Sequence, residues 1–137
     1  MSILALDTSA LAALATKMVG APVTVTTCDN PEHLGNASRP TNDRYIIRLN
    51  PCLLKRGNRK YLQFTFWHEV GHCVFNHPKI PGDSDWPKNK NLDFVDTYLY
   101  HERQADEFAS YCVELFKERH PNETFWGMFI EPFITEI

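Results

Sequence analysis

The segment that most constrains this chain is a predicted helix over residues 59–76 that carries two histidines four residues apart. Large apolar residues recur along it at helical spacing and predict a buried face formed by Leu62, Phe66, Val70, Cys73 and Val74. His68 and His72 stand one turn apart, so both imidazoles project from the same side of the helix. Polar rings in so apolar a helix need partners, and one cation can bind both. The sequence therefore predicts a metal site on this helix.

The residues around the two histidines point to zinc chemistry. Glu69 projects about 100° round the helix from His68, which suits contact with a water molecule on the metal better than equal ligation. Because zinc lowers the pKa of a bound water to about 7, a neighbouring carboxylate can act as its general base. Gly71 has no side chain and leaves room for substrate or for another chain segment. An accidental match on an exposed helix is the alternative for this short pattern taken alone.

A catalytic zinc ion usually has three protein ligands and a water molecule, so the two histidines leave one ligand to find. Pro78 occupies the position where a longer form of the motif has a third histidine. Four residues remain as candidates: His77, His101, Glu102 and Asp106. Glu102 and Asp106 are four apart on a second predicted helix and share a face. We favour Glu102 as the third ligand, with Asp106 holding the free N–H of a ligand imidazole.

Other polar residues near Glu102 are candidates for substrate contacts. His101 projects about 100° from Glu102 and could lie at the rim of the site, although an ordinary surface histidine is the commoner case. Tyr100 and His101 are the predicted oxyanion or substrate contacts, and Tyr98 and Tyr111 remain alternatives. His77 directly follows the first motif and fits a C-terminal cap favoured by the helix dipole.

Local patterns predict a single α+β domain over residues 1–137. A helix over 8–19 has N-cap candidates at its start and Gly20 as its stop, and strands follow over 23–27 and 44–49. The small mixed or antiparallel sheet is expected to pack against the active-site helix and a ligand-bearing helix over 97–118. Residues 28–42 are predicted to be a loop, and residues 78–96 a long connection that could form either a lid or a flexible surface loop. Asn122 could cap a short helix that ends before Pro132.

Composition narrows the class of protein. The net charge of −3 gives no basic surface of the kind that nucleic-acid binders carry, and the cluster from Lys55 to Lys60 fits a solvated loop and helix start. No apolar stretch approaches the roughly 20 residues of a membrane span, and Asp7 interrupts the apolar N-terminal run. The four cysteines form no Cys-x-x-Cys pair and are expected to be reduced thiols. We expect a cytoplasmic protein with no membrane and no direct nucleic-acid partner.

Two segments together resemble the ImmA/IrrE metallopeptidases. Residues 64–72 (FTFWHEVGH) and 102–109 (ERQADEFA) are similar to the family's paired His-Glu-x-x-His and Glu-x-x-Ala-(Asn/Asp)-x-Phe-Ala motifs, and residues 46–50 are similar to its preceding strand. The resemblance covers about half of the chain, roughly 44–112. Trp67 departs from it, since the family usually has a small residue there.

The resemblance implies a minimal zincin-like domain with a gluzincin-like site. His68, His72 and Glu102 would bind Zn²⁺, Glu69 would be the general base and Asp106 would support a ligand. The implied partner is a regulatory protein such as a helix-turn-helix transcriptional repressor, often encoded beside the peptidase on phages or mobile elements. Two alternatives stay open: a zinc-stabilised module or toxin–antitoxin component that sequesters a regulator without hydrolysis, and a metal-free helical protein.

Overall fold

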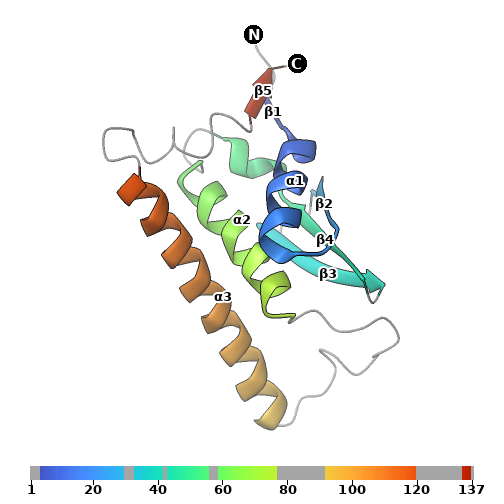
Figure 1. Ribbon diagram of the computed structural model, residues 1–137, viewed down its shortest axis with the longest axis vertical. Coiled ribbons are helices and arrows are strands. Elements are labelled where there is room, and N and C mark those ends of the chain that lie inside the picture. Colours follow the sequence, from blue (N-terminus) through green and yellow to red (C-terminus); the bar gives the residue numbers. More distant parts are fainter. Residues whose placement is uncertain are drawn as a thin grey trace.

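The computed structural model describes residues 4–29, 33–41, 43–55, 59–76, 92–119 and 134–136. These residues form an α+β fold, as the sequence predicts, in which helices pack on a small mixed sheet (Figure 1). In chain order, the elements are β1 (Leu4–Leu6), α1 (Thr8–Val19), β2 (Val23–Thr27), β3 (Gly35–Thr41), β4 (Arg44–Leu49), the 3₁₀ helix η1 (Pro51–Leu54), α2 (Arg59–Val74), α3 (Leu92–Arg119) and β5 (Ile134–Glu136).

The larger sheet has the strand order β2-β4-β3, with β4 parallel to β2 and antiparallel to β3. Alternate residues of β4 are buried, namely Tyr45, Ile47 and Leu49. Val23 and Val25 of β2 pair with two of these and are buried with them. The apolar face of the sheet therefore packs against α1 and α2, and one core cluster joins all of these elements.

The prediction of a loop over residues 28–42 is wrong, because Gly35–Thr41 forms the edge strand β3. Its residues are polar or small and include Pro40, so they show no alternation typical of a strand. An edge strand tolerates proline and polar side chains, since only one of its sides is paired. Pairing with β4 supplies the backbone hydrogen bonds, and the register becomes irregular between Ser38 and Thr41. The short strands β1 and β5, which pair with each other, were also not predicted.

Helix α1 has the bounds and caps that its sequence predicts. The side chain of Asp7 accepts a hydrogen bond from the backbone N–H of Ala10 at 3.0 Å. At the other end Gly20 adopts a φ of 80° and donates its N–H to the carbonyl of Thr16. The φ value explains the glycine, because other residues are strained there.

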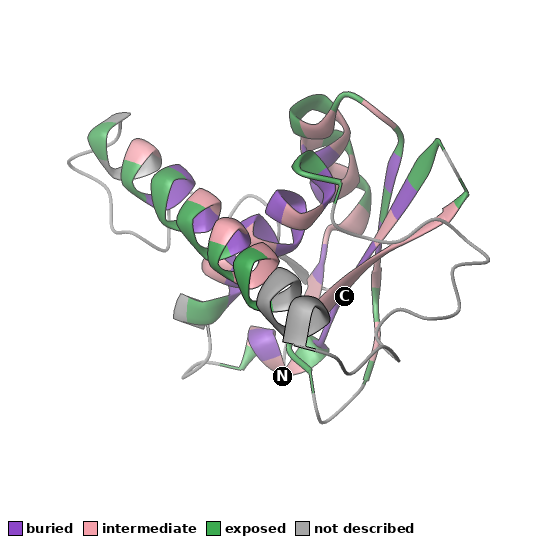
Figure 2. Cartoon of the chain, turned by 90° about the horizontal axis from the view of Figure 1, so that it is seen from below, coloured by how far each residue is buried: buried purple, intermediate pink, exposed green. Residues whose placement is uncertain are grey.

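Helix α2 lies between the sheet on one side and α3 on the other (Figure 1). It is buried on nearly every side, and Figure 2 shows that α3 has buried residues on its inner face and exposed ones on its outer face. The predicted end at residue 76 is two residues late, because Asn76 takes a φ of 58°. Its side-chain oxygen there accepts hydrogen bonds from the Arg39 guanidinium and the Tyr45 hydroxyl, both at 2.7 Å.

Helix α3 begins at Leu92, five residues before the predicted start at 97, and it ends at Arg119 instead of 118. Three predictions concern residues outside the described ones, so the structure does not test them. They are the cap at His77, the connection before Leu92 and the short helix between Asn122 and Pro132. Among the residues that are described, no helix has the length and apolar character needed to cross a membrane.

Candidate metal centre

Two small residues let α2 and α3 approach each other closely. A Cβ atom added to Gly71 would lie 3.1 Å from Phe108 Cδ1 and 3.3 Å from the Cα of Ala105. Ala105 itself is fully buried. The room that Gly71 leaves is therefore filled by another chain segment, which is one of the two possibilities that the sequence left open. Glu102 precedes Ala105 on α3 and Asp106 follows it. This contact therefore brings both acidic residues next to the histidines of α2.

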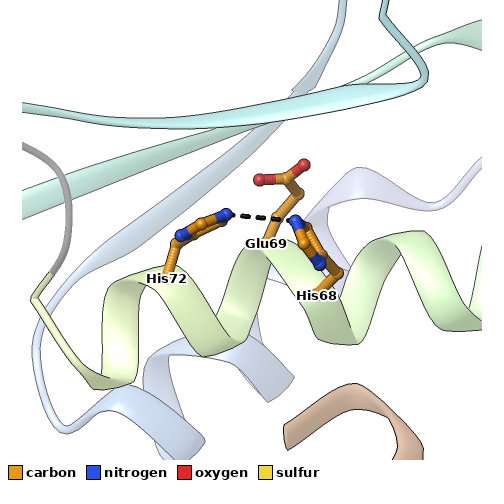
Figure 3. Close-up of side chains that lie close together, drawn as sticks. All are labelled: His68, Glu69 and His72. Carbon is orange, nitrogen blue, oxygen red and sulfur yellow. Dashed lines mark hydrogen bonds between the residues drawn. The ribbon is translucent and has the colours of Figure 1, made fainter. Parts of the chain in front are cut away.

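His68, His72 and Glu102 converge as the sequence predicts for three ligands of one ion. The two Nε2 atoms lie 3.0 Å apart. Glu102 spans them, with Oε2 at 3.1 Å from His68 Nε2 and Oε1 at 3.2 Å from His72 Nε2. Figure 3 shows both imidazoles projecting from the same side of α2. Three donor groups from two helices thus point at one place.

The spacing of these donors fits a zinc ion. Zinc–nitrogen and zinc–oxygen bonds of about 2.0–2.2 Å place tetrahedral ligands about 3.3–3.6 Å apart. The three contacts of 3.0–3.2 Å are only slightly shorter. The side chains of His68 and His72 are 15% and 13% exposed and that of Glu102 is 35% exposed, so solvent can reach the centre. The donor set therefore fits a cation with a further position open to water.

Asp106 orients one of the imidazoles. Its Oδ1 lies 2.7 Å from His68 Nδ1, so a proton on Nδ1 makes a short hydrogen bond to the carboxylate. In a neutral ring, that proton leaves the lone pair on Nε2, the atom that faces His72 and Glu102. Asp106 thus holds the tautomer that metal ligation requires.

Glu69 lies beside the three donors and is buried, with 5% of its surface exposed. Its carboxylate points away from α2 toward the strands of the sheet (Figure 3). The ligand atoms of Glu69, His68 and His72 all lie within 4.8 Å of one another. Glu102, in contrast, is within hydrogen-bonding distance of both imidazoles. Glu102 is therefore better placed as a ligand, and Glu69 is better placed to contact a molecule bound at the open position.

Burial and charge set the protonation of the site in the absence of metal. Burial raises the pKa of Glu69 to about 7, against the opposing effect of His68 and His72. Hydrogen bonds to His68, which has the larger effect, and to His72 hold the pKa of Glu102 far below its usual range. The pKa of His68 is raised overall. Burial is the largest single influence and lowers this pKa, but the hydrogen bond to Glu102 and the charges of nearby carboxylates together outweigh burial. Glu102 is thus ionised at neutral pH, whereas Glu69 exchanges its proton there.

Two of the predicted substrate contacts, Tyr100 and Tyr111, are exposed to solvent. Tyr100 is 59% exposed and touches the ring of His101. Tyr100 is two positions before Glu102, which puts the two side chains about 160° apart around the helix. Tyr111 is 66% exposed on α3. Both tyrosines lie on the outer face of α3, away from the three metal donors. Trp67 is buried in the core, next to Phe66.

Sequence reasoning missed Gly35, which the structure places directly beside the Glu69 carboxylate. The segment that contains Gly35 showed no strand pattern, so no local signal placed it against α2. No protein-family model, curated protein or solved structure matches the chain significantly.

Replacing Asp106 with Asn should weaken zinc binding about 10- to 100-fold, the range typical of residues that support a metal ligand. The amide cannot match the short charge-assisted hydrogen bond to His68 and no longer fixes its tautomer. Competition with a zinc chelator of known affinity measures the change. Glu107→Gln removes a neighbouring exposed charge on α3 and is the matched control. Equal zinc affinity in the two variants would contradict the role given to Asp106.

Without metal, the protein should become less stable as the pH rises from 5 to 8. Glu69 has a pKa of about 7 in the folded chain and an ordinary value of 4.5, so its contribution is complete below the lower value and is lost as the pH passes the higher one. The raised pKa of His68 acts in the same direction. At 1.36 kcal/mol per pKa unit, the Glu69 contribution is about 3 kcal/mol.

Urea denaturation of the chelated protein at several pH values measures this dependence. The Glu69→Gln variant carries no titrating group at this position and should show a much smaller loss of stability over the same range. An identical pH dependence in the wild type and the variant would show that burial of an ionised Glu69 is not the cause.

Proposed function

We propose that this protein is a zinc-dependent endopeptidase in which His68, His72 and Glu102 bind the metal and Glu69 is the general base. The observation that carries the proposal is the convergence of two imidazole nitrogens and a carboxylate at 3.0–3.2 Å, with a second, buried carboxylate beside them. The chain thus offers every protein group that a metallopeptidase centre requires except the group that stabilises the oxyanion.

A bound zinc ion would polarise the scissile carbonyl and acidify a water molecule. Glu69 would accept a proton from that attacking water and return it to the nitrogen of the leaving amide. In the metal-free chain, burial raises the pKa of Glu69 to about 7, so the surrounding protein favours the protonated form that the second step requires. Asp106 would hold His68 in the tautomer that binds the ion.

We also propose a regulatory protein as the substrate, such as a helix-turn-helix transcriptional repressor of a phage or mobile element. The resemblance of residues 64–72 and 102–109 to the paired ImmA/IrrE motifs supports this, because in this structure the two segments meet at the same donor cluster. A cytoplasmic location fits the four cysteines, all of which are free thiols.

A non-catalytic role has one observation in its favour. The donors come from two helices, so a bound ion would tie α2 to α3 and stabilise the fold whether or not it catalyses hydrolysis. The protein would then be a zinc-stabilised module or toxin–antitoxin component that sequesters a regulator. The partial exposure of Glu102 and the buried carboxylate of Glu69 favour catalysis, since a purely structural ion needs neither.

The proposal is tested by metal analysis followed by a cleavage assay. Protein purified without added metal should contain one zinc ion per chain, and the zinc-loaded form should cleave members of a proteome-derived peptide library. A chelator should stop the cleavage and added zinc should restore it. Iron in place of zinc, or cleavage that persists after complete removal of the metal, would contradict the proposal.

A further inference from the structure

The edge strand β3 begins at a glycine that lies against the carboxylate of Glu69. A Cβ atom added to Gly35 would lie 3.1 Å from Glu69 Oε2, 3.1 Å from the carbonyl oxygen of Arg48 and 3.0 Å from Thr65 Cγ2. Such distances are shorter than ordinary van der Waals contacts, so a side chain at this position would force one of its neighbours to move.

The backbone around Gly35 has little freedom to yield. Gly35 pairs with Leu49 of β4, and Asn50 donates its backbone N–H to the carbonyl of Leu34 at 2.8 Å. The side chain of the buried Asn50 also donates to the carbonyl of His33 at 3.1 Å. The Arg48 contact is a backbone atom of β4. The end of the Glu69 side chain is therefore the neighbour that moves most readily.

The direction of that movement is toward the metal donors. The Glu69 carboxylate points from α2 toward the sheet, with an imidazole on either side (Figure 3). Its oxygen already lies within 4.8 Å of the ligand nitrogens of His68 and His72. A carboxylate pushed back from the strand approaches the place on which the donors converge. There it would become a fourth protein ligand and close the site, since structural zinc ions have four protein ligands and catalytic ones keep a position for water.

We propose that Gly35 is a positioning residue that keeps Glu69 from ligating the metal and so keeps the fourth position open. The inference rests on the proposed metal centre and extends it to a residue of a different element. Because Gly35 has no side chain, Glu69 can stay close to β3 and the zinc site stays open.

Cobalt substitution tests this inference without a peptide substrate. Co²⁺ bound to the wild type should give a visible spectrum that changes when azide is added, because azide enters the open position. The Gly35→Ala variant should bind Co²⁺ at least as tightly, but its apparent azide affinity should fall at least tenfold. Azide binding of wild-type strength in the variant would overturn the inference. A wild type that binds no Co²⁺ would instead contradict the metal centre itself.

Rescue variants separate the contact with Glu69 from general crowding. Gly35→Ala combined with Glu69→Asp has a carboxylate one methylene shorter, so azide binding should recover to the level of the Glu69→Asp single variant. Gly35→Ala combined with Thr65→Ser relieves only the Thr65 contact and should not recover. Recovery in the second variant alone would assign the effect to Thr65 and overturn the inference.

A stability cycle in metal-free protein covers the case in which Gly35→Ala folds poorly. The loss in urea midpoint caused by Gly35→Ala is measured in the wild type and again in a Glu69→Ala background, where no carboxylate opposes the new methyl group. The loss should be clearly smaller in the second background. An equal loss in both would show that Gly35 does not act through Glu69.

Discussion

Replacing Glu69 with Gln is expected to reduce the rate of peptide hydrolysis by a factor of about 10²–10⁴ and to leave zinc bound, since removal of a general base typically costs this much. The amide has nearly the same shape as the carboxylate but cannot accept the proton of the attacking water. Glu69 also stands apart from the three closest donors, whose mutual contacts of 3.0–3.2 Å do not involve it. The zinc content of the variant should therefore equal that of the wild type.

This variant also distinguishes catalysis from sequestration. A module that only binds a regulator should retain its partner affinity and its effect on that partner when Glu69 becomes Gln. A peptidase should retain the affinity and lose the cleavage products, which mass spectrometry of the partner detects. Cleavage at the wild-type rate by a zinc-replete Glu69→Gln variant would exclude Glu69 as the base.

Replacing Glu102 with Ala is expected to lower the zinc affinity by more than about 100-fold, because residues that merely support a ligand already cost 10- to 100-fold. Glu102 is the ionised group of the donor set, and its two oxygens contact both imidazoles at 3.1 and 3.2 Å. Its loss removes the charge that offsets the cation and leaves only the two imidazoles as close donors. Hydrolysis should be lost in parallel at low zinc concentration.

The measurement is a chelator competition on the wild type, Glu102→Ala and Glu107→Ala. Glu107 is an exposed carboxylate on the same helix, so its replacement controls for the loss of a charge from α3. Zinc affinity within tenfold of the wild type in Glu102→Ala would show that another group supplies the third ligand. Added zinc should restore Glu102→Ala more readily than it restores Glu69→Gln, since only the former is limited by metal binding.

Patterns of local origin predicted much of the fold. The bounds of α1 follow from its caps at Asp7 and Gly20, and the strands β2 and β4 follow from β-branched and alternating residues. The elements that escaped prediction depend on distant partners. The edge strand β3 acquires its strand geometry from pairing with β4, and β1 and β5 are three-residue segments that pair across nearly the whole chain.

What the sequence by itself determined is the set of chemical groups on each helix. The spacing of His68 and His72, and that of Glu102 and Asp106, fixes which side chains share a helical face, because the helix repeat is a local property. The tertiary structure alone decided how these faces meet. Close packing of Gly71 against Ala105 sets the distances between the donors, and the start of β3 at Gly35 sets the position of the Glu69 carboxylate. Both depend on contacts between segments far apart in the chain, and no local pattern encodes such contacts.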